Sequence, residues 1–307
     1  MRLLAVAATL VALAVSPAAR VGSPAGLPSD WVEVAGAPGG GTLWSGSIPD
    51  ELAPWDHRAS EIYLPPGYDS SRRYPVLYLL HGMRGSPSSF WSGLHLATTL
   101  DESISTGGAS PFIVVTPVAG PTVNPDGGEW AGVWEDYVVQ DVVPWVDAHL
   151  ATNPSPQARA LEGLCAGGYG AVDIGLRHPG MFDTLGSWEG YFAPVFRDGP
   201  FRHASSADLA AHDPTLLVRD DAPELQESGV RFYVSVGGNH ADVLRKWSLA
   251  FARELGGLGL PHRLWLLPAS ERGRFWSATV PSALAYAVAG FRDYAPTSSR
   301  SPRGTSA

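Results

Sequence analysis

The feature of this sequence that most constrains the fold is a series of short, continuous apolar runs separated by helical patterns. The runs cover residues 73–80, 111–116, 158–164, 231–236 and 262–267. Continuous rather than alternating apolar runs indicate strands that are buried on both faces. Strands that are separated by helices form parallel sheets. We therefore expect an α/β fold, a three-layer α/β/α sandwich with a mostly parallel central sheet.

The helical patterns lie between these runs. Residues 133–150 predict a helix that kinks or restarts at Pro144, because proline has no N–H to donate within a helix. Residues 242–255 predict an amphipathic helix, and residues 281–294 predict the last one. A further short strand is expected over 31–34.

The two ends of the chain differ from the middle. Arg2 precedes an apolar stretch, Leu3–Val15, with Thr9 as its one polar residue, and small residues follow it, which is the pattern of a secretory signal. We predict a signal peptide over 1–18, one domain over 19–294 and a disordered tail over 295–307. An uncleaved anchor is the alternative for the first segment. The expected location is secreted or associated with the cell envelope, without a stable membrane span after cleavage.

Charge and motif spacing exclude several classes of protein. The formal net charge of the 307 residues is −9, and no basic run is present that would neutralise phosphates, which argues against a nucleic-acid partner. No phosphate loop, dinucleotide fingerprint or metal-ligand spacing is found, so we predict neither a cofactor nor a metal. The single cysteine, Cys165, cannot form an internal disulfide.

Cys165 lies in a Gly-rich turn between the strand 158–164 and a helical stretch that ends at His178-Pro179-Gly180. The turn reads Gly163-Leu164-Cys165-Ala166-Gly167-Gly168. A nucleophile on such a turn has unfavourable backbone angles, and a side chain two residues away would collide with the turn, so glycine is needed there. The helix N-terminus offers N–H groups to a developing oxyanion and lowers a thiol pKa. A buried, inert cysteine is the alternative.

The chain resembles the putative-esterase family of α/β-hydrolases, which includes esterase D, feruloyl esterases and the mycobacterial antigen 85 mycolyltransferases. Four segments carry the resemblance: residues 78–84 (YLLHGMR), residues 133–145 (VWEDY with VVPW), the Cys165 turn, and residues 264–276 (LWLLP through FW). Cysteine replaces the serine that the family carries, as it does in the related dienelactone hydrolases.

The resemblance implies an oxyanion hole. One donor would be the backbone N–H of Met83, and the other would be the N–H of Ala166, which follows the nucleophile. Arg84, next along the chain, would meet an anionic or sugar group, or is a solvated surface residue. Because these donors belong to the backbone, this half of the machinery tolerates changes of side chain.

The acid and the base are less regular. The order of the fold places the acid after the next-to-last strand, where Asp242 is the candidate, with a helix cap as the alternative. The histidine belongs after the last strand, but Glu271 stands there and no histidine follows His262. Two substitutes for the missing base are considered: His240 on the acid loop, and Glu271 itself.

Tryptophans fall at the predicted rim of the sheet. Trp91, Trp188 and Trp276 are candidates to bind an acyl chain or a sugar, with ordinary packing as the alternative. The first functional hypothesis is a secreted carboxylic-ester hydrolase or acyltransferase with an atypical triad, acting on a small ester, acyl-lipid or glycan. The second is a non-catalytic homologue that binds glycan or lipid of the cell envelope.

Overall fold

The fold is seen in a computed structural model. It describes residues 26–49, 59–119, 129–196, 199–238, 242–268 and 274–291. The predicted signal peptide over 1–18 and the predicted tail over 295–307 lie outside these residues, as do His240 and Glu271.

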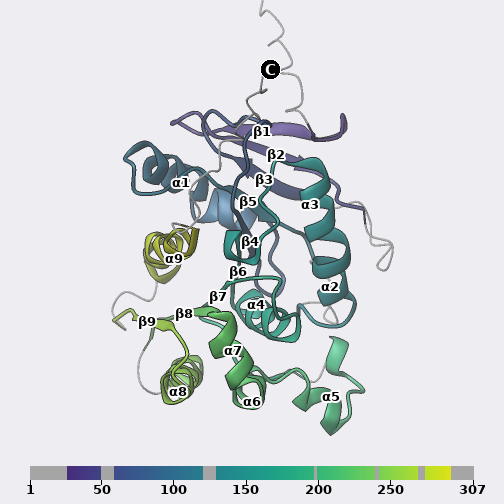
Figure 1. Ribbon diagram of the computed structural model, residues 1–307, viewed down its shortest axis with the longest axis vertical. Helices are drawn as coiled ribbons and strands as arrows, with labels where there is room; N and C mark the ends of the chain where they lie inside the picture. The colour runs from purple at the N-terminus through teal and green to yellow at the C-terminus, as the bar shows by residue number, and fades with distance from the viewer. Residues whose placement is uncertain are drawn as a thin grey trace, which may run out of the picture.

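Nine strands form one sheet in the order β1-β2-β3-β5-β4-β6-β7-β8-β9 (Figure 1). The strands are β1 (Val32–Gly36), β2 (Thr42–Gly46), β3 (Ser60–Leu64), β4 (Val76–Leu80), β5 (Ile113–Thr116), β6 (Arg159–Leu164), β7 (Thr184–Trp188), β8 (Arg231–Val236) and β9 (His262–Leu266). The pairs β1–β2, β2–β3 and β3–β5 are antiparallel, and the pairs from β5–β4 to β8–β9 are parallel. The predicted mostly parallel sheet is confirmed, and the two strands β2 and β3 add an antiparallel side that the sequence analysis did not predict.

Helices cover both faces of the sheet. Those of at least five residues are α1 (Leu96–Ser105), α3 (Val143–His149), α4 (Ala166–Arg177), α5 (Ser206–Ala210), α6 (Pro214–Asp220), α7 (Ala222–Ser228), α8 (Val243–Gly257) and α9 (Phe275–Phe291). Helices α1 and α9 lie on one face, while α3, α4 and α8 lie on the other (Figure 1). Two apolar cores result, one on each side of the sheet, and the predicted three-layer sandwich is confirmed.

The helix predicted over 133–150 is continuous but not regular. It consists of α2 (Val133–Asp136), a π-helical segment η2 (Tyr137–Val142) and α3. Pro144 lies in the first turn of α3, where its missing N–H leaves no hydrogen bond unmade. The wider π-helical turn therefore accommodates the proline that the sequence analysis expected to kink or restart the helix.

Helix α9 begins earlier than predicted. It starts at Phe275 rather than at Pro281, and Pro281 lies inside it. Phe275 and Val280 are buried against the sheet, so packing supports the first turns in spite of the proline. None of the described helices combines the length and the apolar character needed to cross a membrane.

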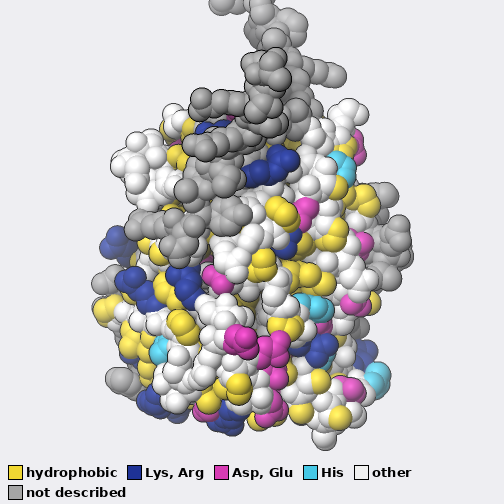
Figure 2. Space-filling view, in the orientation of Figure 1, with side chains coloured by type: hydrophobic (Ala, Val, Ile, Leu, Met, Phe, Trp, Pro, Cys, Tyr) yellow, Lys and Arg dark blue, Asp and Glu magenta, His cyan; other side chains and the backbone are white. Residues whose placement is uncertain are grey.

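The surface carries charges of both signs. On the face drawn in Figure 2, acidic side chains gather toward the middle of the lower half, and basic ones are scattered around them. This face therefore presents no continuous basic surface of the kind that neutralises a run of phosphates.

Candidate active site

The Cys165 turn joins β6 to α4 in the way that its sequence predicts. Cys165 has φ +54° and ψ −117°, a conformation that side-chain-bearing residues rarely adopt. Its carbonyl accepts hydrogen bonds from the N–H groups of Gly168 (2.9 Å) and Tyr169 (3.1 Å), which closes the first turn of α4. The strained backbone thus holds the thiol at the N-terminus of a helix that starts at Ala166.

The glycines on either side of Cys165 are sterically required. A Cβ at Gly163 would lie 2.4 Å from the backbone of Gly167, and a Cβ at Gly167 would lie 1.9 Å from the carbonyl oxygen of Leu80. Neither approach is compatible with a real side chain, because the obstacle is backbone in both cases. The spacing read from the sequence therefore has the structural reason that we expected.

The loop after β4 lies directly against the thiol. The backbone N–H groups of Met83 and Ala166 lie close enough to the Cys165 thiol to favour its thiolate form. His81 holds this loop: its Nε2 accepts the Ala119 N–H (3.1 Å), so its Nδ1 carries the proton and donates to the Gly82 carbonyl (2.9 Å). Both nitrogens of this imidazole are thus committed to the backbone.

The thiol lies in an environment that disfavours the thiolate. Burial raises the pKa of Cys165, and the charges of Glu189 and Glu129 raise this pKa further. The N–H groups of Ala166 and Met83 act in the opposite direction without outweighing burial and the carboxylates. The groups that shift this pKa are thus two backbone amides and two carboxylates. None of them is an imidazole of the described residues.

The sequence analysis missed both carboxylates. Glu189 follows β7 directly, with φ +54°, and the preceding Trp188 accepts the Cys165 N–H (2.9 Å). Glu129 is buried and accepts a hydrogen bond from the hydroxyl of Tyr191 (2.7 Å). Because β7 was not recognised as a strand, Glu189 could not be placed beside the turn, although a charged residue directly after a strand is a usable signal.

The predicted acid and bases have different outcomes. Asp242 caps α8, and its Oδ1 accepts the Leu244 N–H (3.0 Å), as the capping alternative describes. Its proposed role as the triad acid stays a prediction. His240 and Glu271 lie outside the described residues, so their roles also stay predictions.

The tryptophans of the predicted rim are mostly core residues. Trp188 is fully buried, and its indole donates to Glu162 (2.8 Å). Trp91 is also buried, and its indole donates to the hydroxyl of Thr116 (3.0 Å). The packing alternative therefore describes these two residues better than substrate binding does. Trp276 is only partly buried. Arg84 is exposed and adopts φ +59°.

One other cluster brings together side chains that are able to hold a metal. Glu135, Asp173 and His212 each offer a ligand atom, and the three atoms lie within 4.8 Å of one another. The sequence analysis found no metal-ligand spacing because these residues are 38 and 39 positions apart along the chain.

The comparisons with known proteins identify an esterase family and similar esterases. The model of the family described as Putative esterase matches residues 53–257. An endo-1,4-beta-xylanase/feruloyl esterase of Xylanibacter ruminicola is 32% identical over 142 residues, which are 43% of this chain and 19% of that protein. Esterase Rv1288 of Mycobacterium tuberculosis is 31% identical over 42% of this chain and 28% of its own length.

Similar proteins also include an acyltransferase and several solved structures. The diacylglycerol acyltransferase/mycolyltransferase Ag85A of Mycobacterium leprae is 29% identical over 41% of this chain and 39% of its own length. A ferulic acid esterase superposes with a TM-score of 0.70 at 21% identity, over 82% of this chain and 99% of that one. An S-formylglutathione hydrolase from Agrobacterium tumefaciens has a TM-score of 0.63 at 17% identity, over 81% and 95%. At these identities the structures establish the fold alone, and the chain spans well under half of the length of the three related sequences.

Proposed function

The chain belongs to the Putative esterase family, and we propose that it acts on carboxylic esters as a hydrolase or acyltransferase through Cys165. The single observation that carries the proposal is the position of the thiol. It lies on a strained strand-to-helix turn, and the backbone N–H groups of Ala166 and Met83 are near enough to lower the pKa of the thiol. This is the arrangement in which a nucleophile and an oxyanion hole act on one carbonyl group.

The proposed reaction passes through a thioester. The Cys165 sulfur bonds to the ester carbonyl carbon while the base takes the thiol proton, and the N–H groups of Met83 and Ala166 bind the resulting oxyanion. Collapse breaks the bond to the alcohol oxygen, which leaves with that proton. Water or an acceptor alcohol then attacks the thioester, gives its proton to the base, and the sulfur departs and recovers a proton.

The proposed base is His240 or Glu271, and the proposed triad acid is Asp242. His240 follows β8 along the chain, and Glu271 follows β9. Since parallel strands end at the same edge of a sheet, β8 and β9 end at the edge that carries the Cys165 turn. Arg84 and Trp276 remain the proposed contacts for the alcohol or acyl part of the substrate.

The proposed setting is outside the cytoplasm. It rests on the signal-like pattern of residues 1–18. Relatives named feruloyl esterase and mycolyltransferase suggest two acyl classes, aromatic and lipid. A small ester, an acyl-lipid or an acylated glycan is therefore the proposed partner.

A second candidate function is binding without turnover. It is favoured by the environment of the thiol, because burial and the charges of Glu189 and Glu129 raise the pKa of Cys165 and so oppose the reactive thiolate. A family member of this kind would keep the Cys165 turn and the N–H groups of Met83 and Ala166, and would bind an ester or glycan of the cell envelope.

Hydrolysis of short p-nitrophenyl esters and of methyl ferulate by the mature chain tests the proposal. The variants are Cys165→Ala, which removes the nucleophile, and Glu271→His, which supplies an imidazole where the family carries one. Cys165→Ser is the matched control, since it restores the nucleophile of the family at the same position. Products formed with and without diacylglycerol distinguish hydrolysis from acyl transfer.

Turnover that Cys165→Ala abolishes is the expected result. An inactive native chain that gains activity only through Glu271→His would replace the proposal by the binding function. Turnover that survives Cys165→Ala would reject the thiol as the nucleophile.

A further inference from the structure

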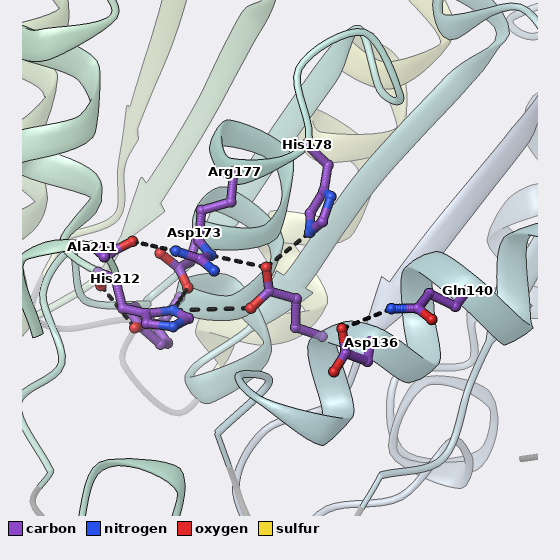
Figure 3. Close-up of polar contacts among 9 residues, drawn as sticks. Asp136, Gln140, Asp173, Arg177, His178, Ala211 and His212 are labelled. Carbon is purple, nitrogen blue, oxygen red and sulfur yellow. Dashed lines mark hydrogen bonds and ion pairs between the residues drawn. The ribbon is translucent and has the colours of Figure 1, made fainter. Parts of the chain in front are cut away.

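Five charged or titratable side chains meet beside α4. Glu135 comes from α2, Asp173 and Arg177 come from α4, His178 follows α4, and His212 precedes α6 (Figure 3). Glu135 and Asp173 are buried, at 4% and 0% exposure. None of these side chains belongs to the proposed catalytic machinery.

The contacts within the cluster converge on the two carboxylates. Glu135 Oε1 accepts hydrogen bonds from Arg177 Nε and His178 Nε2, both at 2.8 Å. Asp173 Oδ2 lies 2.8 Å from His212 Nδ1, and Glu135 Oε2 lies 4.0 Å from the same nitrogen. In Figure 3 the His212 ring lies next to the Asp173 carboxylate, to which a dashed line joins it. One nitrogen and two carboxylate groups thus point at a common volume.

The polar groups of the cluster are not all satisfied. Asp173 Oδ1 is buried and has no hydrogen-bond partner, although its carboxylate points into the cluster. A buried polar atom in this state costs about 1–3 kcal/mol. A cation bound in the cluster would interact with this unpartnered carboxylate oxygen.

The backbone around His212 is fixed by the same helix that carries Asp173. The hydroxyl of Tyr169 donates to the His212 carbonyl (2.8 Å), and Arg177 Nη1 donates to the Ala211 carbonyl (2.7 Å). The Phe201 ring packs against the imidazole, with centroids 5.3 Å apart. The imidazole and the carboxylate are therefore positioned before any ligand arrives.

We propose that Glu135, Asp173 and His212 form a binding site for a divalent transition-metal ion of the zinc type. Zinc binds imidazole nitrogen and carboxylate oxygen at about 2.0–2.2 Å, so ligand atoms in a tetrahedral site are about 3.3 Å apart. The separations of 2.8 and 4.0 Å bracket this value, and small rotations of the side chains would equalise them. Arg177 and His178 hold Glu135 through its other oxygen, in the role of groups that orient a metal ligand.

The site would link three separate parts of the chain. Glu135 precedes η2, Asp173 belongs to the helix that starts at the nucleophile turn, and His212 belongs to the segment between β7 and β8. A bound ion would fasten that segment, with α5 to α7, to the nucleophile helix. A nitrogen ligand favours zinc-like ions over magnesium, which prefers oxygen ligands and keeps its waters.

The test uses the full mature chain, purified without a polyhistidine tag and treated with a chelator. Zinc is then added, and bound metal per chain and the melting temperature are measured. One zinc per chain is expected, with a rise in melting temperature on the order of 5 °C at saturating zinc. Asp173→Asn and His212→Gln should lose both effects. His203→Gln, which changes an exposed histidine outside the cluster, is the matched control and should keep them.

Absence of zinc binding by the native chain overturns the proposal, as does binding that survives both Asp173→Asn and His212→Gln. An equal response to magnesium overturns the assignment to a transition metal. Circular dichroism verifies that the variants fold. If Asp173→Asn does not fold, the more exposed His212→Gln and the metal content of the native chain decide the matter. None of these readouts requires ester turnover.

Discussion

Two pairs of buried carboxylates differ in their surroundings, one beside Cys165 at the start of α4 and the other further along this helix. Glu135, beside Asp173, accepts hydrogen bonds from Arg177 and His178, and its pKa is lowered. Glu129 and Glu189 lie beside Cys165, where their charges raise the pKa of the thiol. Glu135 is bound by Arg177 and His178 and Asp173 by His212, whereas the pair beside Cys165 acts on the thiol. A buried glutamate thus joins α2 to α4 in one place and raises the pKa of a thiol in the other.

The largest effect that distinguishes the two pairs is expected from Arg177→Met. It removes the guanidinium from the buried Glu135 and should lower the free energy of unfolding by about 2–4 kcal/mol. Arg219→Met is the matched control, because Arg219 makes a pair of similar length with Glu254 at the exposed surface. That variant should lose far less, because solvent screens an exposed ion pair. Urea unfolding of both variants measures the difference, and equal losses would contradict the comparison.

A fifth buried carboxylate, Glu162, extends the comparison to pH. Glu162 is fully buried beneath the turn, and burial raises its pKa to about 8. Its stabilising contribution is fully present below the ordinary glutamate value near 4.5 and is lost as the pH rises toward about 8. Between about pH 6 and pH 7.5 the native chain should lose about 2 kcal/mol of unfolding free energy that Glu162→Gln does not lose. Parallel pH profiles of the two proteins would show that this carboxyl group is not protonated in the fold.

Tyr191→Phe probes the hydrogen bond that Glu129 accepts. Removal of a hydroxyl that donates to a buried carboxylate should cost about 1.5 kcal/mol of unfolding free energy. The control is Tyr74→Phe, whose hydroxyl accepts the neutral Asp69 N–H and whose loss should cost about 0.5–1 kcal/mol. A Tyr191→Phe variant as stable as the native chain would mean that Glu129 needs no donor at this place.

The smallest effect in free energy is expected at the thiol itself. Glu189→Gln removes a charge that raises the pKa of Cys165, so the thiolate fraction at neutral pH should increase. The rate of alkylation by iodoacetamide should rise about three- to tenfold, because a larger fraction of the thiol is then ionised. Glu254→Gln, which changes an exposed carboxylate paired with Arg219, should leave the rate unchanged. An identical pH–rate profile in Glu189→Gln would exclude Glu189 as a source of the shift.

Local patterns predicted the fold because each of them is a property of a short segment. The continuous apolar runs identified β4, β5, β6, β8 and β9. Strand β7 was missed because its sequence, TLGSW, contains Gly186. A Cβ at Gly186 would lie 2.4 Å from the Glu162 side chain. Glycine is needed there because this side chain of the neighbouring strand β6 leaves no room for a Cβ. No pattern within β7 itself expresses that requirement.

The Cys165 turn could also be predicted, because its requirements are local. The groups that act on its thiol could not be predicted. The glycines at 163 and 167 are needed by a turn of a few residues, so their spacing is visible in the chain. Glu129 and Glu189 reach Cys165 from 36 and 24 residues away along the chain. The order of the parallel strands, rather than any sequence spacing, brings them to one edge of the sheet.

By itself, the sequence determined the alternation of buried strands and helices, the strained turn with Cys165, and membership of an esterase family. Those features follow from backbone sterics and from the burial of continuous apolar runs, which act over a few residues at a time. Only the tertiary structure decided which carboxylates meet Arg177 and His212 and which face the thiol. Electrostatic interactions depend on distance and burial in space, and neither is set by the separation of residues along the chain.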